Sequence, residues 1–216
     1  MLRYRKEKEE IVSRFLRLYD AGMINMFEGN ISMRMDDCVL ITPSQMEKDQ
    51  ITAEDVVEID MEGNRLNDNG RSPSSEYRMH LAIYRLRDDL KAVVHTHSPY
   101  ATAYAVAGIP ISVSMAETYM FFGGEIPVCS YGAPGTDDIS ADFRKYFIDE
   151  DKDSVLVGNH GAVSSARTLQ EAFSKTEAIE KLAMIDSEVR KLGSERRFTE
   201  AEKETLLKFY RERKDR

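Results

Sequence analysis

The chain has 216 residues, of which 42% are hydrophobic and 31% are charged, a balance that is typical of globular proteins and excludes an intrinsically disordered one. Lys and Arg number 30 against 38 Asp and Glu, a net charge of −8, so a general nucleic-acid binder, which needs a basic surface, is not expected. No stretch approaches the ~18 uncharged residues of a membrane helix, and the N-terminus lacks the apolar core of a secretory signal. One cytoplasmic domain, residues 1–216, is expected.

The N-terminal part predicts one helix followed by three short strands. Apolar residues recur at helical spacing through residues 5–21, and Gly22 offers a stop. β-prone runs at 31–35, 39–42 and 56–61 then follow one another with turn residues between them. Strands this close leave no room for a crossover helix of a dozen or more residues, so they should pair antiparallel.

The remainder alternates helices and strands. Ser74 and Ser75 can cap a helix that runs to about Arg87, and Thr168 opens a capping box whose helix Gly193 ends. The other predicted elements are strands at 92–96, 111–114, 126–129 and 154–158, helices at 100–106 and 136–147, and a charged C-terminal helix from about residue 199. Together they predict an α/β fold with a mixed, mostly antiparallel central sheet and helices on both faces.

The two cysteines, Cys38 and Cys129, lie far apart and form no Cys-x-x-Cys pattern. Two free thiols in a reducing compartment are expected rather than a disulfide. Neither has a neighbour that marks it as a nucleophile, so both are interpreted as small buried hydrophobic residues.

Three of the four histidines lie where metal ligands would be expected. His95 and His97 end an apolar strand, and side chains two residues apart on a strand point to the same face, with Cα atoms about 6.5 Å apart. His160 follows another apolar strand, between Gly158 and Gly161, whose freedom would let the backbone turn sharply. The three rings could converge on one ion, although ordinary half-buried histidines bound to backbone groups would show the same pattern.

The fourth histidine, His80, lies inside the predicted helix among apolar residues and is interpreted as a helix-face residue rather than a ligand. Glu76 begins that helix, directly after Ser74 and Ser75. An acid in a first turn is favoured by the helix dipole, but the same N-terminus could receive a phosphate while the carboxylate faces a metal. Spacing alone leaves both interpretations open.

Two polar turns could contribute to a phosphate site. Residues 27–32 place Gly29 and Asn30 just before a strand, and residues 42–44 follow the next one. Turn N–H groups and hydroxyls commonly hold oxyanions, but each turn could equally be a plain connection.

Taken together, these segments resemble the class II aldolase/adducin family, and its L-fuculose-1-phosphate aldolase branch most closely. The resemblance runs from about Arg5 to Leu192. It is carried, in matching order, by Gly29-Asn30-Ile31-Ser32, Ile41-Thr42-Pro43-Ser44, Pro73-Ser74-Ser75-Glu76, Val94-His95-Thr96-His97-Ser98, Pro134-Gly135-Thr136 and Asn159-His160-Gly161.

The resemblance implies one zinc ion on His95, His97 and His160, with Glu76 as a further ligand or as the catalytic acid/base. Related 4-epimerases have Asp at that position, so Glu76 favours carbon–carbon bond cleavage. The family's phosphate site maps onto Asn30, Ser44, Ser74 and Ser75, with Gly29 shaping the turn.

The sequence departs from the fuculose-phosphate pattern in three places. Ser44-Gln45 replaces Thr-Gly in the second phosphate turn, where Gln would be strained if the backbone needs the freedom of glycine. Those aldolases also lend a tyrosine to the neighbouring subunit's site from the segment before Gly-Gly. The aligned position here is Glu117, with Tyr119 two residues on, so these two are the candidates for the second proton transfer. The charged C-terminal tail also matches poorly.

The implied activity is a zinc-dependent aldolase that cleaves a ketose 1-phosphate to dihydroxyacetone phosphate and a small aldehyde, in a homotetramer with sites at subunit boundaries. The substrate could be L-fuculose 1-phosphate, another deoxy-ketose 1-phosphate or a methylthio analogue. A sugar-phosphate 4-epimerase and a methylthioribulose-phosphate dehydratase are the alternative enzymes. A non-catalytic adducin-like assembly domain is the alternative outside enzymes, and the retention of Glu76 and three histidines argues against it.

Overall fold

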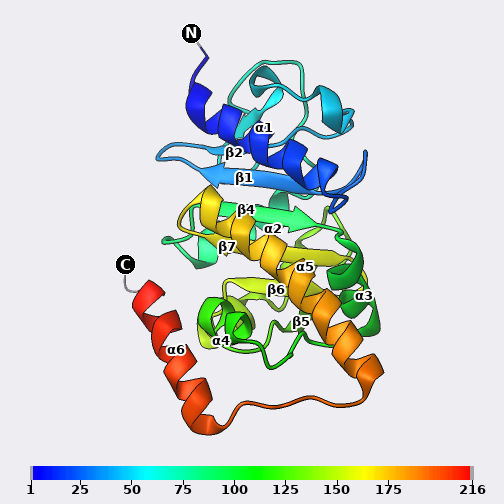
Figure 1. The fold of residues 1–216 in the computed structure, drawn as a ribbon. Helices are drawn as coiled ribbons and strands as arrows, with labels where there is room; N and C mark the ends of the chain where they lie inside the picture. Colours follow the sequence, from blue (N-terminus) through cyan, green and yellow to red (C-terminus); the bar gives the residue numbers. More distant parts are fainter. Residues whose placement is uncertain (1, 215–216) are drawn as a thin grey trace.

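A computed structural model describes residues 2–214 and has a seven-stranded sheet at its centre (Figure 1). The strand order is β3-β2-β1-β4-β7-β6-β5, and every neighbouring pair is antiparallel except β5 with β6. The antiparallel pairing predicted for the first three strands is confirmed. The strands are β1 (Asn30–Arg34), β2 (Val39–Ile41), β3 (Val57–Ile59), β4 (Ala92–Thr96), β5 (Val128–Cys129), β6 (Ser154–Val157) and β7 (Gly161–Ala166).

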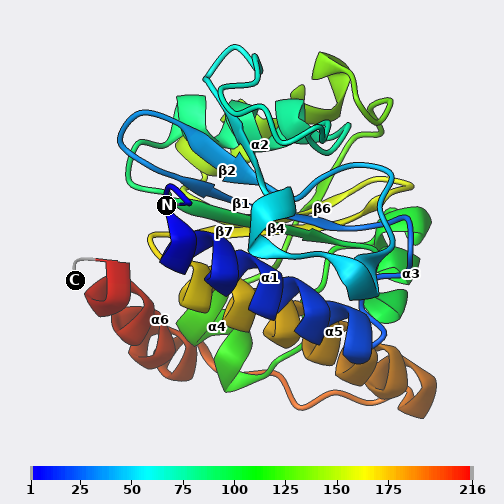
Figure 2. The same ribbon diagram turned by 90° about the horizontal axis from the view of Figure 1, so that it is seen from above.

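Helices cover both faces of the sheet, as predicted. Figure 2 shows α2 on one face and α1 and α5 on the other. Successive β4 residues alternate between the two cores, since Val93 packs on the α2 side and Val94 on the α1 side. The α-helices among the described residues are α1 (Arg5–Asp20), α2 (Tyr77–Leu86), α3 (Pro99–Ala107), α4 (Ala116–Phe122), α5 (Leu169–Leu192) and α6 (Glu200–Lys214).

Two predicted strands are shorter in the structure than the sequence suggests. Residues 111–114 form only a bridge, in which Ile111 and Ile126 exchange backbone hydrogen bonds of 3.1 and 3.0 Å. β5 consists of Val128 and Cys129 alone, which pair parallel with Leu156 and Val157 of β6.

The prediction of a continuous helix at 136–147 is wrong. The segment forms a 3₁₀ turn (Asp137–Ser140) and a π-helical turn (Lys145–Asp149). Between them, Asp142 Oδ2 accepts a hydrogen bond of 2.7 Å from the backbone N–H of Ser130, and Phe143 is fully buried. These tertiary contacts override the local helical pattern.

Two elements, α4 and β7, are absent from the sequence-based prediction. The α4 segment has only a terminal signal, Gly123, whose φ of 65° is typical of a helix C-terminus. β7 reads Gly-Ala-Val-Ser-Ser-Ala, a composition closer to a turn than to a strand, yet all six residues are buried between β4 and β6. Its serine hydroxyls donate to the carbonyl oxygens of Ala172 and Asp153, so these buried polar groups are hydrogen-bonded.

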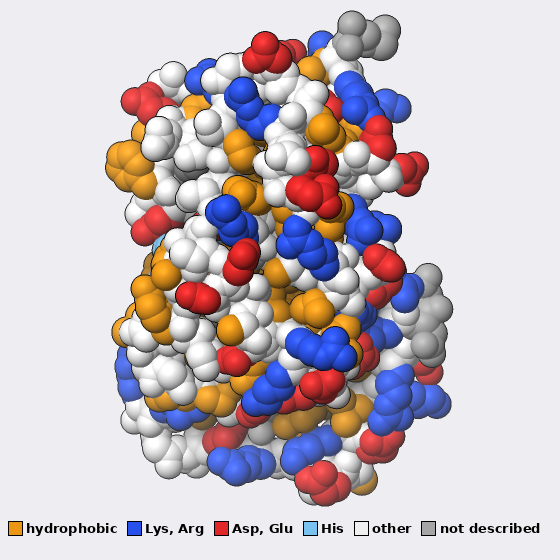
Figure 3. Space-filling model, turned by 180° about the vertical axis from the view of Figure 1, so that it is seen from behind, with side chains coloured by type: hydrophobic (Ala, Val, Ile, Leu, Met, Phe, Trp, Pro, Cys, Tyr) orange, Lys and Arg blue, Asp and Glu red, His pale blue; other side chains and the backbone are white. Residues whose placement is uncertain are grey.

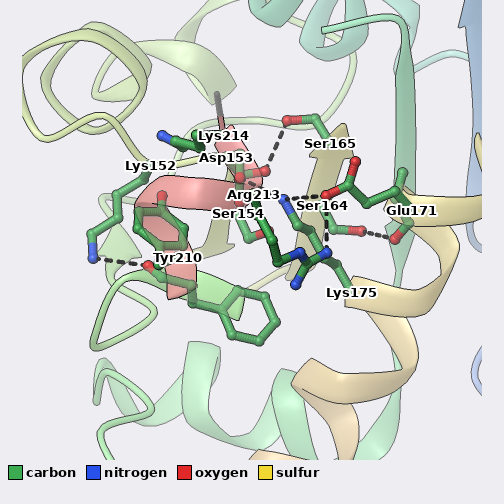
Figure 4. A network of polar contacts seen from close by, with 12 residues as sticks. Lys152, Asp153, Ser154, Ser164, Ser165, Glu171, Lys175, Tyr210, Arg213 and Lys214 are labelled. Atoms are coloured by element: carbon green, nitrogen blue, oxygen red, sulfur yellow. Dashed lines mark hydrogen bonds and ion pairs between the residues drawn. The ribbon is translucent and has the colours of Figure 1, made fainter. Parts of the chain in front are cut away.

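The C-terminal helix α6 makes both polar and ring contacts with the rest of the chain. No α6 residue among the described ones is buried. Arg213 pairs with Glu171 at 3.1 Å, beside the buried pair of Lys175 with Asp153 at 2.5 Å (Figure 4). These contacts lie where β6 begins and β7 ends, which is the opposite end of the sheet from His95.

Charged side chains of both signs are mixed on the face of the molecule seen in Figure 3. On the face seen in Figure 3, Lys and Arg are interspersed with Asp and Glu without a continuous basic patch. Among the helices of residues 2–214, none combines the length and apolar character that crossing a membrane requires. Both cysteines are buried and free, as the sequence indicated.

Candidate metal centre and active site

The structure brings Glu76, His95, His97 and His160 together in one cluster. Their potential ligand atoms lie within 4.8 Å of one another, and the centroids of the three imidazole rings are 4.6, 4.8 and 4.8 Å apart. His97 is half-buried whereas the other three are buried, so the cluster is reached from solvent on the His97 side.

The ends of β4 and β6 and the start of α2 position these side chains. His95 lies in β4, and His97 directly follows that strand, as the alternation along a strand predicts. Glu76 is the N-cap residue of α2. His160 lies in the turn that joins β6 to β7, and the antiparallel pairing of β7 with β4 returns the turn to the other two rings.

The turn that presents His160 works differently from the prediction. Its left-handed residue is Asn159, with a φ of 54°, and neither flanking glycine has a positive φ. Gly161 is required instead by close approach, because a Cβ there would lie 2.4 Å from the carbonyl oxygen of Thr96 and 3.1 Å from His95 Cε1. The glycine therefore allows β7 to pack directly against the rings of His95 and His97.

Contacts behind the rings leave ligand nitrogens facing the cluster. His95 Nδ1 lies 3.0 Å from the carbonyl oxygen of Ala162; a carbonyl only accepts, so Nδ1 carries a proton and Nε2 is the nitrogen that faces the cluster. His97 Nδ1 faces the Glu28 carboxylate at 3.6 Å. Such outer partners are typical of metal-binding histidines. Burial lowers the pKa of His97 to about 3, so this ring is neutral near pH 7.

Both oxygens of the Glu76 carboxylate are occupied. Oε1 accepts a hydrogen bond from His160 Nε2 at 2.6 Å, Oε2 accepts one from Asn30 Nδ2 at 2.9 Å, and Oε2 also lies 3.3 Å from His95 Nε2. Burial would raise the pKa of Glu76, but the imidazoles of His95 and His160 hold it well below its usual range, so the group is ionised.

The donor set fits a divalent metal ion. His95 Nε2 lies 3.3 Å from Glu76 Oε2 and 2.9 Å from His97 Nε2, so three atoms that can each present a lone pair converge, as the ligands of a cation do. Three imidazoles with one carboxylate are ligands that Zn²⁺ accepts. The residues present therefore fit the metal that the sequence predicts.

His80 lies outside this cluster but is connected to it. The residue is fully buried, its Nε2 contacts Asn30 Oδ1, and its Nδ1 lies 2.7 Å from Ser32 Oγ. The description as a plain helix-face residue was therefore incomplete. The spacing of Glu76 and His80, which are four residues apart, places them on one face of the helix, but it does not predict the contacts with β1.

Two of the predicted phosphate residues, Asn30 and Ser74, contact Glu76 directly. Asn30 is the register partner of His95, and Gly29 precedes it. A bridge between Pro43 and Pro73 brings the two serine-containing turns side by side. Ser74 is buried and Ser75 is exposed. The predicted cap differs in detail: Glu76 is the N-cap residue and its own side chain makes no cap hydrogen bond, whereas Ser74 Oγ accepts a hydrogen bond of 3.4 Å from the backbone N–H of Glu76.

The turn that contains Ser44 and Gln45 carries the backbone strain that its sequence suggested. Gln45 has a φ of 53°, the left-handed region that favours glycine. The adjacent Ser44 is half-buried, and its N–H donates to the carbonyl oxygen of Ser72 at 2.9 Å. The hydroxyl of Ser44, rather than its backbone N–H, is therefore the group available to an anion.

Glu117 and Tyr119 lie on α4, outside the metal cluster. The Tyr119 ring packs edge-on against Phe198 at 5.7 Å between centroids, and Glu117 lines a surface pocket with Phe121 and Lys181. No contact among the described residues links either side chain to the cluster of the same chain. A role in a neighbouring subunit's site stays a prediction.

Comparisons with known proteins agree with this geometry. Residues 9–186 match the family described as Class II Aldolase and Adducin N-terminal domain. A 5-deoxy-D-ribulose 1-phosphate aldolase of Bacillus thuringiensis is 34% identical over 207 residues, which cover 95% of each chain. A 5-methylthioribulose-1-phosphate/5-deoxyribulose-1-phosphate aldolase of Rhodospirillum rubrum is 36% identical, covering 72% of this chain and 68% of its own.

Similarity extends to a solved structure over almost the whole chain. An L-fuculose 1-phosphate aldolase superposes with a TM-score of 0.89 at 28% identity and covers 97% of this chain and 98% of its own. The matched residues include the strands and turns that build the Glu76 and histidine cluster. The chain therefore belongs to the class II aldolase and adducin family, within its aldolase branch.

Proposed function

We propose that the protein is a zinc-dependent aldolase that cleaves a ketose 1-phosphate to dihydroxyacetone phosphate and a small aldehyde. The observation that carries the proposal is the Glu76 cluster, which combines a metal's donor set with a buried, ionised carboxylate. A Zn²⁺ ion on His95, His97 and His160 would supply Lewis-acid polarisation of the ketose carbonyl and its adjacent hydroxyl.

The chain's own groups divide the remaining work. Glu76 would move the proton at the carbon or hydroxyl beside the metal, a contribution typically worth about 10²–10⁴-fold. Asn30, Ser44, Ser74 and Ser75 would bind the substrate phosphate and fix the register of the ketose, which converts binding energy into orientation. Glu117 or Tyr119 would serve the second proton transfer from a neighbouring subunit, in a homotetramer whose sites lie at subunit boundaries.

The relatives indicate which substrates to assay first. Two of them are named for 5-deoxyribulose 1-phosphate, and one of these also for its methylthio analogue. Cleavage between C3 and C4 of the five-carbon ketose would release dihydroxyacetone phosphate and a two-carbon aldehyde. L-Fuculose 1-phosphate is the third substrate, because the superposed structure is named for it.

A paired measurement on Glu76→Gln tests the proposal. The change keeps the size and hydrogen bonding of the side chain but removes the proton acceptor, so kcat should fall by about 10²-fold or more while zinc stays bound to the three histidines. Dihydroxyacetone phosphate release and metal content are measured beside wild type. If Glu76→Gln keeps full activity and full metal content, Glu76 is only an acid at the start of a helix, and the proposed role in proton transfer is wrong. If the variant loses both metal and activity, the result supports a role of Glu76 as a metal ligand only.

Two further measurements test the site's composition. Elemental analysis should find one equivalent of metal per chain, and no uptake of added zinc would contradict the histidine site. Sedimentation should show a tetramer, and a fully active monomer would contradict a site shared between subunits.

A further inference from the structure

α2 and β1 place five side chains in one buried chain of hydrogen bonds. Glu76, His80 and Tyr84 are spaced four residues apart and share a face of α2, and Asn30 and Ser32 share a face of β1. The chain begins at Tyr84, whose Oη lies 2.7 Å from Ser32 Oγ, and Ser32 Oγ lies 2.7 Å from His80 Nδ1. On the other side of the imidazole ring, His80 Nε2 contacts Asn30 Oδ1. Asn30 Nδ2 then lies 2.9 Å from Glu76 Oε2. All five residues are buried.

Chemistry assigns every proton in this chain of contacts. An ionised carboxylate only accepts, so the amide nitrogen of Asn30 must face Glu76 and its oxygen must face His80. That oxygen also only accepts, so His80 carries its proton on Nε2 and accepts at Nδ1. Ser32 then donates to Nδ1, and Tyr84 donates to Ser32. The donors therefore all point the same way, toward Glu76.

We propose that His80 is a positioning residue that acts through Asn30 to fix the direction of the Glu76 carboxylate. This inference rests on the proposed role of Glu76 in proton transfer. Of the side chains described in contact with the Glu76 carboxylate, Asn30 is the one that is not itself a candidate metal ligand. Its amide is therefore available to hold Oε2 while the imidazoles are engaged with an ion.

The surroundings of His80 support a fixed, neutral ring. His80 is fully buried and lies between Asn30 and Ser32, so its ring has no contact with solvent. Burial lowers its pKa to about 3, so Nδ1 keeps the lone pair that Ser32 needs. The hydrogen bonds from Tyr84 to Ser32 and from Ser32 to His80 thus stabilise the Nε2–H tautomer of His80. In that tautomer, Nε2–H donates to Asn30 Oδ1 and fixes the orientation of the Asn30 amide.

The first test reads the tautomer directly and needs no substrate. ¹⁵N NMR of histidine-labelled, metal-free protein should show four imidazoles, with the His80 signals identified by their loss in His80→Gln. We expect the Nε2–H tautomer at pH 7 in the wild type. A ring protonated at Nδ1 alone, or at both nitrogens, would overturn the assignment.

The second test separates positioning from a merely structural role. His80→Leu removes the donor to Asn30, whereas His80→Gln can supply an amide N–H at the same reach. We expect kcat of His80→Leu to fall by about 10–100-fold with unchanged zinc content and KM, and His80→Gln to stay within about threefold of wild type. Equal losses in the two variants, or no loss in His80→Leu, would overturn the proposal.

Matched serine variants complete the test. Ser32→Ala should lower kcat because it removes the donor that selects the tautomer, whereas Ser165→Ala removes an equally buried hydroxyl that donates to the carbonyl oxygen of Asp153 and should not. Equal decreases of kcat in the two variants would contradict the role of Ser32 in positioning His80. If wild-type protein cleaves no ketose phosphate, the proposed function fails, while the tautomer measurement still decides the arrangement of His80.

Discussion

A single methyl group at Gly161 should weaken metal binding more than it weakens the fold. An alanine Cβ at this position would lie 2.4 Å from the carbonyl oxygen of Thr96, 3.1 Å from His95 Cε1 and 3.2 Å from His97 Cδ2. Non-bonded heavy atoms normally sit about 3.5 Å apart. Because the nearest atom belongs to the backbone, the first residue of β7 must move away from β4 by about 1 Å.

That movement would act on the ligands through their supports. Thr96 pairs with Ala162 across the two strands, and the carbonyl oxygen of Ala162 is the group that orients His95. Overpacking a site of this kind costs about 1–3 kcal/mol of unfolding free energy. Displacing the outer partner of a ligating histidine typically costs about 10–100-fold in metal affinity. Both effects are expected in Gly161→Ala.

Chelator competition measures the zinc affinity, and thermal unfolding with and without zinc measures the stability. Gly193→Ala is the matched control, because Gly193 has a φ of 69° at the end of α5 and no atom within 4 Å of an added Cβ. It should cost about 1 kcal/mol from the left-handed backbone and leave zinc affinity unchanged. A zinc affinity of Gly161→Ala equal to wild type would refute the reasoning.

Three other predictions concern stability. Gln45→Gly should stabilise the protein by up to about 1 kcal/mol in urea unfolding, since it releases a left-handed residue; a loss of stability would contradict the strain. Glu58→Gln should cost about 3–5 kcal/mol, because Lys8 is fully buried and 2.8 Å from Glu58, whereas Glu204→Gln at an exposed pair should have no measurable effect. The free energy of unfolding of metal-free protein should fall as the pH drops from 6.5 toward 3. Burial lowers the pKa of His80 to about 3 in the folded protein, so over this range the unfolded chain binds a proton at His80 that the folded protein does not bind. His80→Gln should flatten this pH dependence, and parallel stability curves for the variant and the wild type would contradict the prediction.

The elements that could be predicted are those whose signals are local. The antiparallel strands β1, β2 and β3 follow from short β-prone runs with turns between them, and the long helix α5 follows from Thr168, whose hydroxyl accepts from the N–H of Glu171, and from Gly193. The capping box is only half formed, because the Glu171 carboxylate pairs with Lys175 and Arg213 instead. Local signals therefore fixed where α5 begins and ends, and tertiary contacts decided what its first turn binds.

The elements that escaped prediction depend on distant partners. β7 is a strand because β4 and β6 flank it, although its small polar residues have little β-propensity of their own. In the candidate site, the three histidines and Glu76 were recognisable from their positions at strand and helix ends. The contacts of His80 with Asn30 and Ser32 were not, since they join two elements whose relative placement no local pattern states.

The C-terminal segment contacts α4, away from the candidate metal cluster. The C-terminal segment lies along the loop and helix at 114–123: Glu195 Oε1 accepts from the N–H of Ser114 at 2.7 Å, Phe198 packs on Tyr119, and the Tyr210 ring lies directly over Gly123. None of these contacts reaches the metal cluster. If Tyr119 serves a neighbouring subunit, as we propose, the C-terminal segment governs that proton transfer by holding α4, whereas the metal and Glu76 depend on β4, β7 and α2. Changes in the charged tail should then alter the second proton transfer without altering zinc binding.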